Sequence, residues 1–329
     1  MREKTVLVTG GGGYIGSHFV KLLMQKGYTP VVIDNFENGH RDSVLCPDWY
    51  EGELEDRALL DRVFRAHNIG AVVHFAAYMY VAESMTNPRK YWERNVGGLL
   101  AVSGAAMDHD VRKFLYSSSC SVYGAPLQQP ITESTAKAPI NPYGWTKYIG
   151  EHVLESYRRS HGLAPVMLRY FNVSGADPDL ELGERHKLEI HAVPVMLQAA
   201  RDGAVFNVFG NDYATPDGTC IRDYIHVWDL ARAHLCALEY LDHPGDAYAF
   251  NLGTGRGASV LELAAAVEAA TGKKVQLNFQ PRRDGDPPML VADASLARRV
   301  LGWAPEYADI TSVVASAWRF MSTGRGCGT

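Results

Sequence analysis

Cysteine is scarce in this chain of 329 residues, and its five cysteines are far apart. None belongs to a C-x-x-C pair, so the sequence offers neither a disulfide framework nor a thiolate metal site. The twelve histidines show no H-E-x-x-H or similar ligand spacing, and we expect no metal. Reduced thiols are typical of the cytoplasm, which is where we expect the protein.

Long hydrophobic runs and clusters of basic residues are also missing. No apolar run approaches the roughly 20 residues of a membrane-spanning helix, and Met1 to Lys4 lead into a strand pattern without a secretory leader. The formal net charge is −5, and no basic patch is present to attract nucleic acid or an anionic membrane. We expect a soluble globular protein of about two domains.

The N-terminal 34 residues follow the pattern of a dinucleotide-binding βαβ unit. A buried strand at 5–9 enters a glycine turn, then a helix at 17–26, then a second strand at 29–33 that ends in Asp34. The glycines Gly10, Gly13 and Gly16 have G-x-x-G-x-x-G spacing, and they let the backbone approach a pyrophosphate. Asp34 can accept hydrogen bonds from a ribose 2′-OH and would repel a 2′-phosphate. The unit therefore predicts a nucleotide site that prefers NAD.

Strands and helices continue to alternate up to residue 172. We expect helices at 54–66, 88–107 and 142–160, and strands at 71–75, 113–117 and 164–169. This alternation predicts an α/β fold, a Rossmann-type doubly wound parallel sheet over residues 1–172. Beyond it, a smaller α/β domain over 173–222 and 253–329 is expected to hold the substrate, with 223–252 returning to the first domain.

Polar residues follow several of these strands, and one helix begins with an acid–base pair. Ser117 to Ser119 and Tyr170 to Asn172 stand at strand ends, which meet along one edge of a parallel sheet. Tyr143 and Lys147 lie one turn apart at the start of the helix at 142–160. A cation held there favours the phenolate and adapts tyrosine to acid–base catalysis.

These motifs, in this order, resemble the extended short-chain dehydrogenase/reductase family over residues 5 to about 293. Within it they are similar to the branch of 4-epimerases that interconvert UDP-glucose and UDP-galactose. The strings that carry the resemblance are Gly13-Tyr14-Ile15-Gly16-Ser17-His18, His74-Phe75-Ala76-Ala77, Leu168-Arg169-Tyr170-Phe171-Asn172, Phe209-Gly210-Asn211-Asp212-Tyr213, Arg222-Asp223-Tyr224-Ile225-His226-Val227 and Arg282-Arg283-Asp284-Gly285-Asp286.

The resemblance implies a bound NAD that is reduced and reoxidised within one turnover. Tyr143 would take the proton of the sugar 4-hydroxyl, and Ser119 would bind the same oxygen. Lys147 would contact the nicotinamide ribose and, with the positive nicotinamide, lower the pKa of Tyr143. The cofactor is expected to contact Gly10, Gly13, Tyr14, Ile15, Gly16, Asp34, Asn35, Asn38, Gly39, Glu53, Leu54, Phe75, Ala76, Ala77, Asn95, Ser117, Tyr143, Lys147, Tyr170 and Phe171. The UDP-sugar is expected to contact Ser119, Tyr143, Asn172, His191, Asn207, Phe209, Arg222, Tyr224, Arg283, Asp286 and Leu290.

Three departures from the pattern of the resembled enzymes concern the cofactor. Glu53 stands in place of Asp, Met79 in place of a frequent lysine, and Arg94 in place of an asparagine, so NAD retention is expected to be weaker. A fourth departure concerns the sugar, because Leu290 is intermediate between the aromatic and small residues found there. We expect a preference for UDP-glucose and UDP-galactose with side activity on N-acetylhexosamines. The helices at 88–107 and 142–160 imply a homodimer, by resemblance alone.

Other activities on this scaffold stay open or are disfavoured by the residues. Dehydration and decarboxylation need carboxylates after the serines of residues 117–119, where Cys120 and Ser121 stand instead. The alternatives are a 4-epimerase of another UDP-sugar (N-acetylhexosamine, pentose or glucuronate), a net NAD-dependent oxidoreductase, and a non-catalytic nucleotide sensor. Intact Ser119, Tyr143 and Lys147 argue against the sensor.

Overall fold

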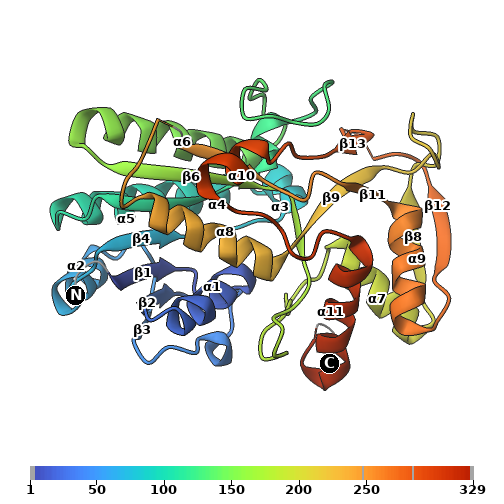
Figure 1. The fold of residues 1–329 in the computed structure, drawn as a ribbon, viewed down its shortest axis with the longest axis horizontal. Helices are drawn as coiled ribbons and strands as arrows, with labels where there is room; N and C mark the ends of the chain where they lie inside the picture. The colour runs from blue at the N-terminus through green and yellow to red at the C-terminus, as the bar shows by residue number, and fades with distance from the viewer. Residues whose placement is uncertain (1–3, 247, 284, 327–329) are drawn as a thin grey trace.

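A seven-stranded parallel sheet organises the fold of the computed structural model, which describes residues 4–246, 248–283 and 285–326 (Figure 1). The strand order is β10-β6-β5-β4-β1-β2-β3, so the chain changes direction of travel across the sheet between β1 and β4. Ligands of doubly wound sheets bind at such a switch point. The strands are β1 (Thr5–Thr9), β2 (Thr29–Asp34), β3 (Trp49–Glu51), β4 (Ala71–His74), β5 (Lys113–Ser119), β6 (Ala164–Tyr170) and β10 (Ala249–Leu252). The predicted Rossmann-type fold is confirmed.

Helices cover both faces of this sheet because its strands are apolar on both sides. In β1, Val6 and Val8 enter one hydrophobic cluster and Leu7 enters the other. Helices α1 and α8 pack on the first cluster, and α2, α5 and α6 pack on the second. The helices are α1 (Tyr14–Gln25), α2 (Arg57–Ala66), α5 (Gly97–Asp108), α6 (Pro142–His161) and α8 (Val227–Tyr240).

Smaller sheets and three helices form the second part of the molecule, at the right of Figure 1. Strand β9 pairs with β7, β11 and β13, and β8 pairs with β12. Helices α7, α9 and α11 pack together on a third hydrophobic cluster. Ser259 and Glu262 form a capping box that begins α9. The elements are β7 (Asn172–Ser174), α7 (Ala192–Asp202), β8 (Val205–Phe209), β9 (Ile221–His226), β11 (Gly257–Ser259), α9 (Val260–Thr271), β12 (Gln276–Gln280), β13 (Met289–Leu290) and α11 (Ile310–Phe320). Helix α10 (Ser295–Leu301) packs instead on α8 and β10 of the first part.

The prediction of one continuous helix at 88–107 is wrong in the middle of that range. This range is divided into α4 (Pro88–Tyr91), a π-helical turn (Trp92–Val96) and α5. The wider turn carries Asn95 inward, where its amide donates to the Tyr78 carbonyl (3.0 Å) and to Thr146 Oγ1 (3.1 Å) and accepts from the Tyr78 N–H (2.8 Å). The apolar pattern of a helix does not reveal such an insertion, which is common at functional sites.

The helix predicted from residue 54 begins three residues later, at Arg57. Asp56 caps it by accepting a hydrogen bond from the N–H of Leu59 at 3.1 Å. Glu53 and Leu54 therefore belong to the loop after β3. Short additional elements are η2 (Arg41–Ser43), α3 (Val81–Thr86), η4 (Cys120–Tyr123) and the π-helical η5 (Met321–Arg325).

The chain crosses between the two parts more than once. After β6 it enters the second part through β7, and after β9 it returns along α8 to add β10 to the edge of the main sheet, parallel to β6. The assignment of residues 223–252 to the first domain stays a prediction, and residues 223–226 belong to β9. Among the residues that the structure describes, none of the helices combines the length and apolar character that crossing a bilayer requires.

Candidate active site

A cavity of about 420 Å³ lies at the carboxyl ends of β1, β2, β4, β5 and β6. Every residue expected to contact the cofactor lines it, from the glycine turn at Gly10 to Phe171 after β6. So do the three residues expected to be catalytic. Their common position follows from the parallel sheet, which brings strand ends that are distant in sequence to one edge. Their chemical roles remain predictions.

The turn at the start of α1 has space only for glycine at two positions. Gly10 has φ of 74°, and a Cβ there would lie 2.6 Å from the backbone nitrogen of Ala76. A Cβ on Gly16 would lie 2.2 Å from the carbonyl oxygen of Gly10. The close packing of turn, helix and β4 leaves the N-terminus of α1 open to a pyrophosphate.

Asp34 closes the same turn from the end of β2. Its carboxylate accepts hydrogen bonds from the N–H groups of Gly12 and Phe36, both at 2.8 Å. Burial raises the pKa of Asp34, and the two N–H donors oppose that rise. The carboxylate is therefore fixed in direction, as recognition of a ribose hydroxyl requires.

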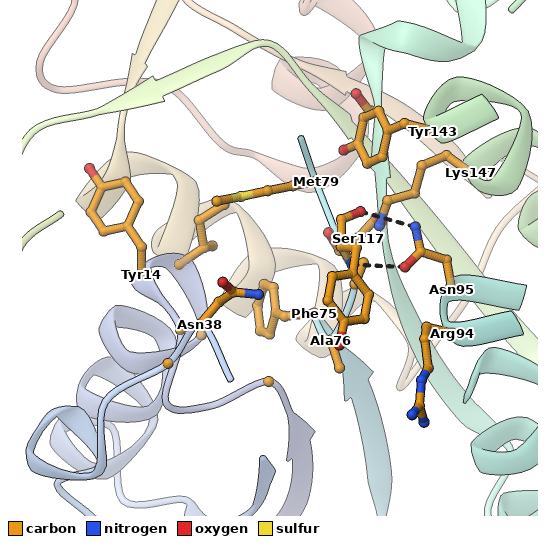
Figure 2. Close-up of a pocket in the computed structure, with 18 of the residues that line it drawn as sticks. Tyr14, Asn38, Phe75, Ala76, Met79, Arg94, Asn95, Ser117, Tyr143 and Lys147 are labelled. Carbon is orange, nitrogen blue, oxygen red and sulfur yellow. Dashed lines mark hydrogen bonds between the residues drawn. The ribbon is translucent and has the colours of Figure 1, made fainter. Parts of the chain in front are cut away.

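Glu53 and Arg94, two of the three residues that depart from the pattern of the resembled enzymes near the cofactor, form an ion pair. Arg94 reaches Glu53 at 3.3 Å and Glu55 at 3.4 Å, and the Asn35 amide donates to Glu53 at 3.3 Å. Met79 lines the cavity at another place, where its thioether supplies no charge (Figure 2). Arg94 thus pairs with the carboxylates of Glu53 and Glu55 at one end of the cavity.

Tyr143 and Lys147 project from the first two turns of α6 into the cavity (Figure 2). The helix begins as predicted at Pro142, and Asn141 caps it by accepting from the N–H of Gly144 at 2.8 Å. The ammonium of Lys147 donates to the Ser117 carbonyl at 2.6 Å and lies 5.9 Å from the centre of the Tyr143 ring.

Burial controls both ionisable groups of this pair. It raises the pKa of Tyr143 to about 12, against a smaller opposing effect of the Ser119 hydroxyl, and it lowers the pKa of Lys147 to about 7. Desolvation sets the direction of the Tyr143 shift in the chain alone, because burial disfavours the phenolate. The lowering of this pKa by Lys147 together with the positive nicotinamide of bound NAD stays a prediction.

Four of the expected substrate contacts line this cavity: Ser119, Tyr143, Asn172 and His191. The others lie in the second part of the molecule and do not line it. Arg283 stacks on Phe209, with 3.7 Å from its guanidinium carbon to the ring centre, and Arg222 faces Asp286 at 3.7 Å. The remaining three are Asn207 on β8, Tyr224 on β9 and Leu290 on β13.

Tyr224 differs from its neighbours on β9 in its surroundings. Its ring is packed in the hydrophobic cluster of the second part and lines a separate depression beside Thr254 and Arg256. Its assignment as a substrate contact stays a prediction, as do those of the residues around β8 and β13.

Sequence reasoning missed three residues that line the substrate end of the cavity: Glu184, His186 and Ile190. They belong to residues 184–191, which we call the strap and which join β7 to α7. Of this stretch, only His191 was assigned a role from the sequence. The recurrence of Glu and His at 184, 186, 189 and 191 was the available signal, and the fold brings these four side chains together.

Known proteins with similar sequences and structures act on nucleotide sugars. The family model of the NAD dependent epimerase/dehydratase family matches residues 6–253. A UDP-glucose 4-epimerase of Rhizobium leguminosarum bv. trifolii is 48% identical over 321 residues, which are 97% of each chain. The structure of UDP-glucose 4-epimerase from Brucella ovis in complex with NAD is 48% identical, with a TM-score of 0.93 over 96% of this chain and 98% of that one. The enzyme from Bifidobacterium longum, in complex with NAD+ and UDP, is 38% identical, with a TM-score of 0.90 over 97% and 98%.

Proposed function

The chain belongs to the NAD dependent epimerase/dehydratase family, and on that premise we propose that it interconverts UDP-glucose and UDP-galactose. One observation carries the proposal: Ser119, Tyr143 and Lys147 line the same cavity as the nucleotide-binding turn. The chain is an NAD-dependent isomerase on this reading. It oxidises C4 of the sugar, the 4-keto sugar turns within the site, and reduction on the other face gives the epimer.

The residues of the chain would handle the proton while the sugar is oxidised and reduced. When bound, NAD supplies a hydride acceptor and a positive ring charge that favours the phenolate of Tyr143. Tyr143 accepts the proton of the 4-hydroxyl and returns it after the sugar has turned. Ser119, whose hydroxyl accepts a hydrogen bond from the Ser121 N–H at 3.1 Å, is placed to bind the same oxygen. Lys147 adds positive charge beside the pair.

The cofactor and the substrate would occupy different parts of the molecule. We propose that residues 1–172 with 223–252 hold NAD, and that 173–222 and 253–329 hold the UDP-sugar. The strand-end cavity supports the first assignment. The arginines Arg222 and Arg283 support the second, because a guanidinium can bind two oxygens of a diphosphate at once.

The decisive assay is UDP-galactose incubated with the purified protein without added NAD. We expect an equilibrium mixture dominated by UDP-glucose, with at least about a 100-fold loss in Tyr143→Phe, in line with the usual contribution of acid–base catalysis. Tyr148→Phe is the matched control, because Tyr148 is on the same helix and packs on Trp145 and His152 outside the cavity.

Three results of this assay have different meanings. Activity only after NAD is added indicates epimerisation with a weakly held cofactor. Net accumulation of NADH indicates an oxidoreductase instead. No conversion of UDP-galactose with or without added NAD contradicts the proposed substrate. A panel of UDP-N-acetylhexosamines, UDP-pentoses and UDP-glucuronate then tests the other UDP-sugars.

We propose that the range of UDP-sugars accepted as substrates depends on Leu290. This residue pairs with Arg222 between β13 and β9, and its size is intermediate between an aromatic and a small side chain. We expect a preference for UDP-glucose and UDP-galactose with slower turnover of N-acetylhexosamines. Leu290→Ser should reduce the difference in kcat/KM between the two sugar types. Equal kcat/KM for both sugar types in the wild-type protein would contradict this preference.

We also propose a homodimer and a cytoplasmic location. Exposed apolar side chains occur on adjoining helices, at Met85, Trp92, Leu100 and Trp145, and burial between two copies would remove them from water. Sedimentation should give twice the mass of the chain, and Leu100→Glu should shift it toward the single chain. The four cysteines of the described residues are free, which fits a reducing compartment and can be checked by fractionation.

A further inference from the structure

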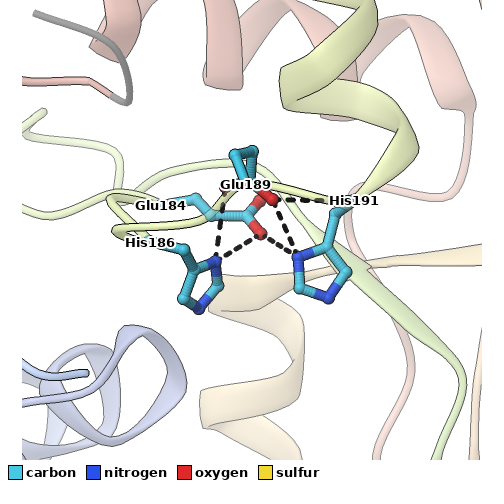
Figure 3. A group of neighbouring side chains, drawn as sticks. All are labelled: Glu184, His186, Glu189 and His191. Atoms are coloured by element: carbon cyan, nitrogen blue, oxygen red, sulfur yellow. Dashed lines mark hydrogen bonds and ion pairs between the residues drawn. The ribbon is translucent and has the colours of Figure 1, made fainter. Parts of the chain in front are cut away.

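Four side chains of the strap form a closed ring of charge at the substrate end of the cavity (Figure 3). Glu184 lies 3.2 Å from Nδ1 of His186 and 2.7 Å from Nδ1 of His191. Glu189 lies 3.3 Å from Nδ1 of His186 and 3.0 Å from Nδ1 of His191. Each carboxylate therefore faces both imidazoles, and each imidazole faces both carboxylates through the same nitrogen.

Burial makes these charges depend on one another. The side chains of Glu184 and Glu189 are 6% and 5% exposed, so two carboxylates are removed from water. Buried carboxylates are stable only when they are paired and hydrogen-bonded. Glu189 is also held in direction by the N–H groups of Ile190 and His191, both at 2.9 Å. The ring is thus rigid and is neutral overall when both imidazoles are charged.

His191 is the member of the ring that faces the open cavity. Its side chain is 40% exposed, whereas that of His186 is 7% exposed. His191 lines the cavity beside Asn172 and stands at the N-cap of α7, where the helix also favours an anion. Nδ1 points to the carboxylates, and among the residues that the structure describes Nε2 has no hydrogen-bond partner.

We propose that Glu184 and Glu189 are positioning residues that hold His191 as an imidazolium, with its Nε2–H directed at the diphosphate of the UDP-sugar. This inference rests on the proposed function and extends it to residues with no assigned part in it. A neutral imidazole that donates through Nδ1 has only a lone pair at Nε2, and a lone pair repels a phosphate oxygen. The carboxylates therefore decide whether His191 attracts the substrate.

The electrostatics agree with this geometry. Burial lowers the pKa of His191, but Glu184 and Glu189 raise it more, to about 10; the same balance raises the pKa of His186 to about 9. Tyr14 is a further titratable group at the ring, since its side chain meets His186 edge-on at 6.1 Å. Cys120 and Tyr143 line the same cavity. Histidine with an ordinary pKa near 6.5 would lose its charge at neutral pH.

The test measures UDP binding to the NAD-loaded protein by calorimetry between pH 6 and pH 9, so it does not depend on turnover. Wild type should bind UDP with a Kd that changes little over this range, because His191 stays charged. In E184Q/E189Q the Kd should be close to that of wild type at pH 6 and rise about 10-fold or more by pH 8.5, since His191 returns to its ordinary pKa. H191Q should bind weakly at every pH.

The matched control is E181Q, which removes a carboxylate just before the strap. Glu181 pairs with Lys21 and its side chain is 54% exposed, so its loss should leave both the Kd and its pH dependence unchanged. Imidazole ¹H–¹⁵N spectra of the wild-type protein provide a second measurement that needs no variant to fold. They should show His191 protonated at pH 8.

Three outcomes overturn the inference. One is a wild-type His191 that titrates near pH 6.5, and another is a double variant whose Kd rises equally at all pH values. The third is a stoichiometric divalent metal in the wild-type protein that the double variant lacks, which would make the four side chains a metal site. Epimerisation without the expected Kd shift removes this inference alone, whereas a protein that binds no UDP removes the proposed function with it.

Discussion

Glu151 and Arg169 form a buried two-pronged ion pair between α6 and β6, with Nε–Oε1 at 2.8 Å and Nη2–Oε2 at 2.6 Å. Both side chains are 6% exposed. Ser118 on β5 donates to the same carboxylate at 2.6 Å, and Arg169 also donates to the hydroxyl of Tyr123 at 2.9 Å. Glu151 lies one turn beyond Lys147, so the pair fixes α6 to the two strands beside it.

Loss of this pair should destabilise the protein strongly. Arg169→Met leaves the buried Glu151 carboxylate without its cation, and we expect the free energy of unfolding to fall by about 3–5 kcal/mol. Arg158→Met is the control on the same helix, because it breaks an exposed pair with Glu155 and should cost less than about 1 kcal/mol. Urea denaturation of both variants measures the difference. Equal losses would contradict the prediction.

The stability of the cofactor-free protein should rise with pH through Lys147. Burial lowers its folded pKa from an ordinary 10.5 to about 7, so between these values the unfolded chain binds a proton that the folded chain does not. The free energy of unfolding therefore rises by about 1.4 kcal/mol per pH unit in this window and is unaffected below it. Relative to Lys147→Met, wild type should gain about 2–3 kcal/mol from pH 7 to pH 9 in denaturation experiments.

A constant difference between wild type and Lys147→Met at pH 6, 7, 8 and 9 would show that the ammonium is not desolvated. Lys26→Met, at the exposed end of α1, controls for the loss of a positive charge as such.

Asp34 should determine the choice between NAD and NADP. Its carboxylate is directed by two backbone N–H groups, and a charged hydrogen bond to ribose contributes about 1.5–3 kcal/mol. Asp34→Asn should reduce the ratio of NAD to NADP affinity about 10-fold to 100-fold. Glu51→Gln removes a charge from the adjacent position of β3, outside the cavity, and should change the ratio little. Titration of cofactor-stripped protein measures both.

Cofactor retention should improve when a cation is restored at residue 79. Met79→Lys places an ammonium at the cavity wall, and one charge-assisted contact to the cofactor diphosphate should lower the NAD Kd about 10-fold. Met24→Lys is the control, since Met24, near the end of α1, is 40% exposed and does not line the cavity. The amount of NAD that remains bound after gel filtration measures the difference. Equal retention of NAD in both variants would contradict the hypothesis that Met79 weakens NAD binding.

The sequence was sufficient for the parts of the site that follow from strand topology. Asp34 and Ser117 to Ser119 were placed together because parallel strands must end at a common edge, and the cavity lies there. The start of α6 at Pro142 was also predictable, since proline and the capping Asn141 act locally.

Features that depend on contacts between distant segments could not be predicted in this way. The π-helical turn that buries Asn95 exists because its amide meets Tyr78 and Thr146, and no local pattern encodes those partners. The charged ring of Glu184, Glu189 and the two histidines lies in a strap without regular structure. The pKa of Tyr143 depended on how deeply the fold buries it, which a spacing of four residues does not specify.

The position of β10 has a consequence for folding during synthesis. Residues 249–252 complete the main sheet beside β6, although β7, α7, β8 and β9 of the second part are synthesised before them. Until they leave the ribosome, β6 is an edge strand with unpaired N–H and C=O groups, a surface that invites aggregation. A nascent chain that stops at residue 172 would hold the glycine turn, Tyr143 and Lys147 yet lack a finished sheet. The main sheet is therefore not completed first, and chaperones should engage the chain until β10 has emerged.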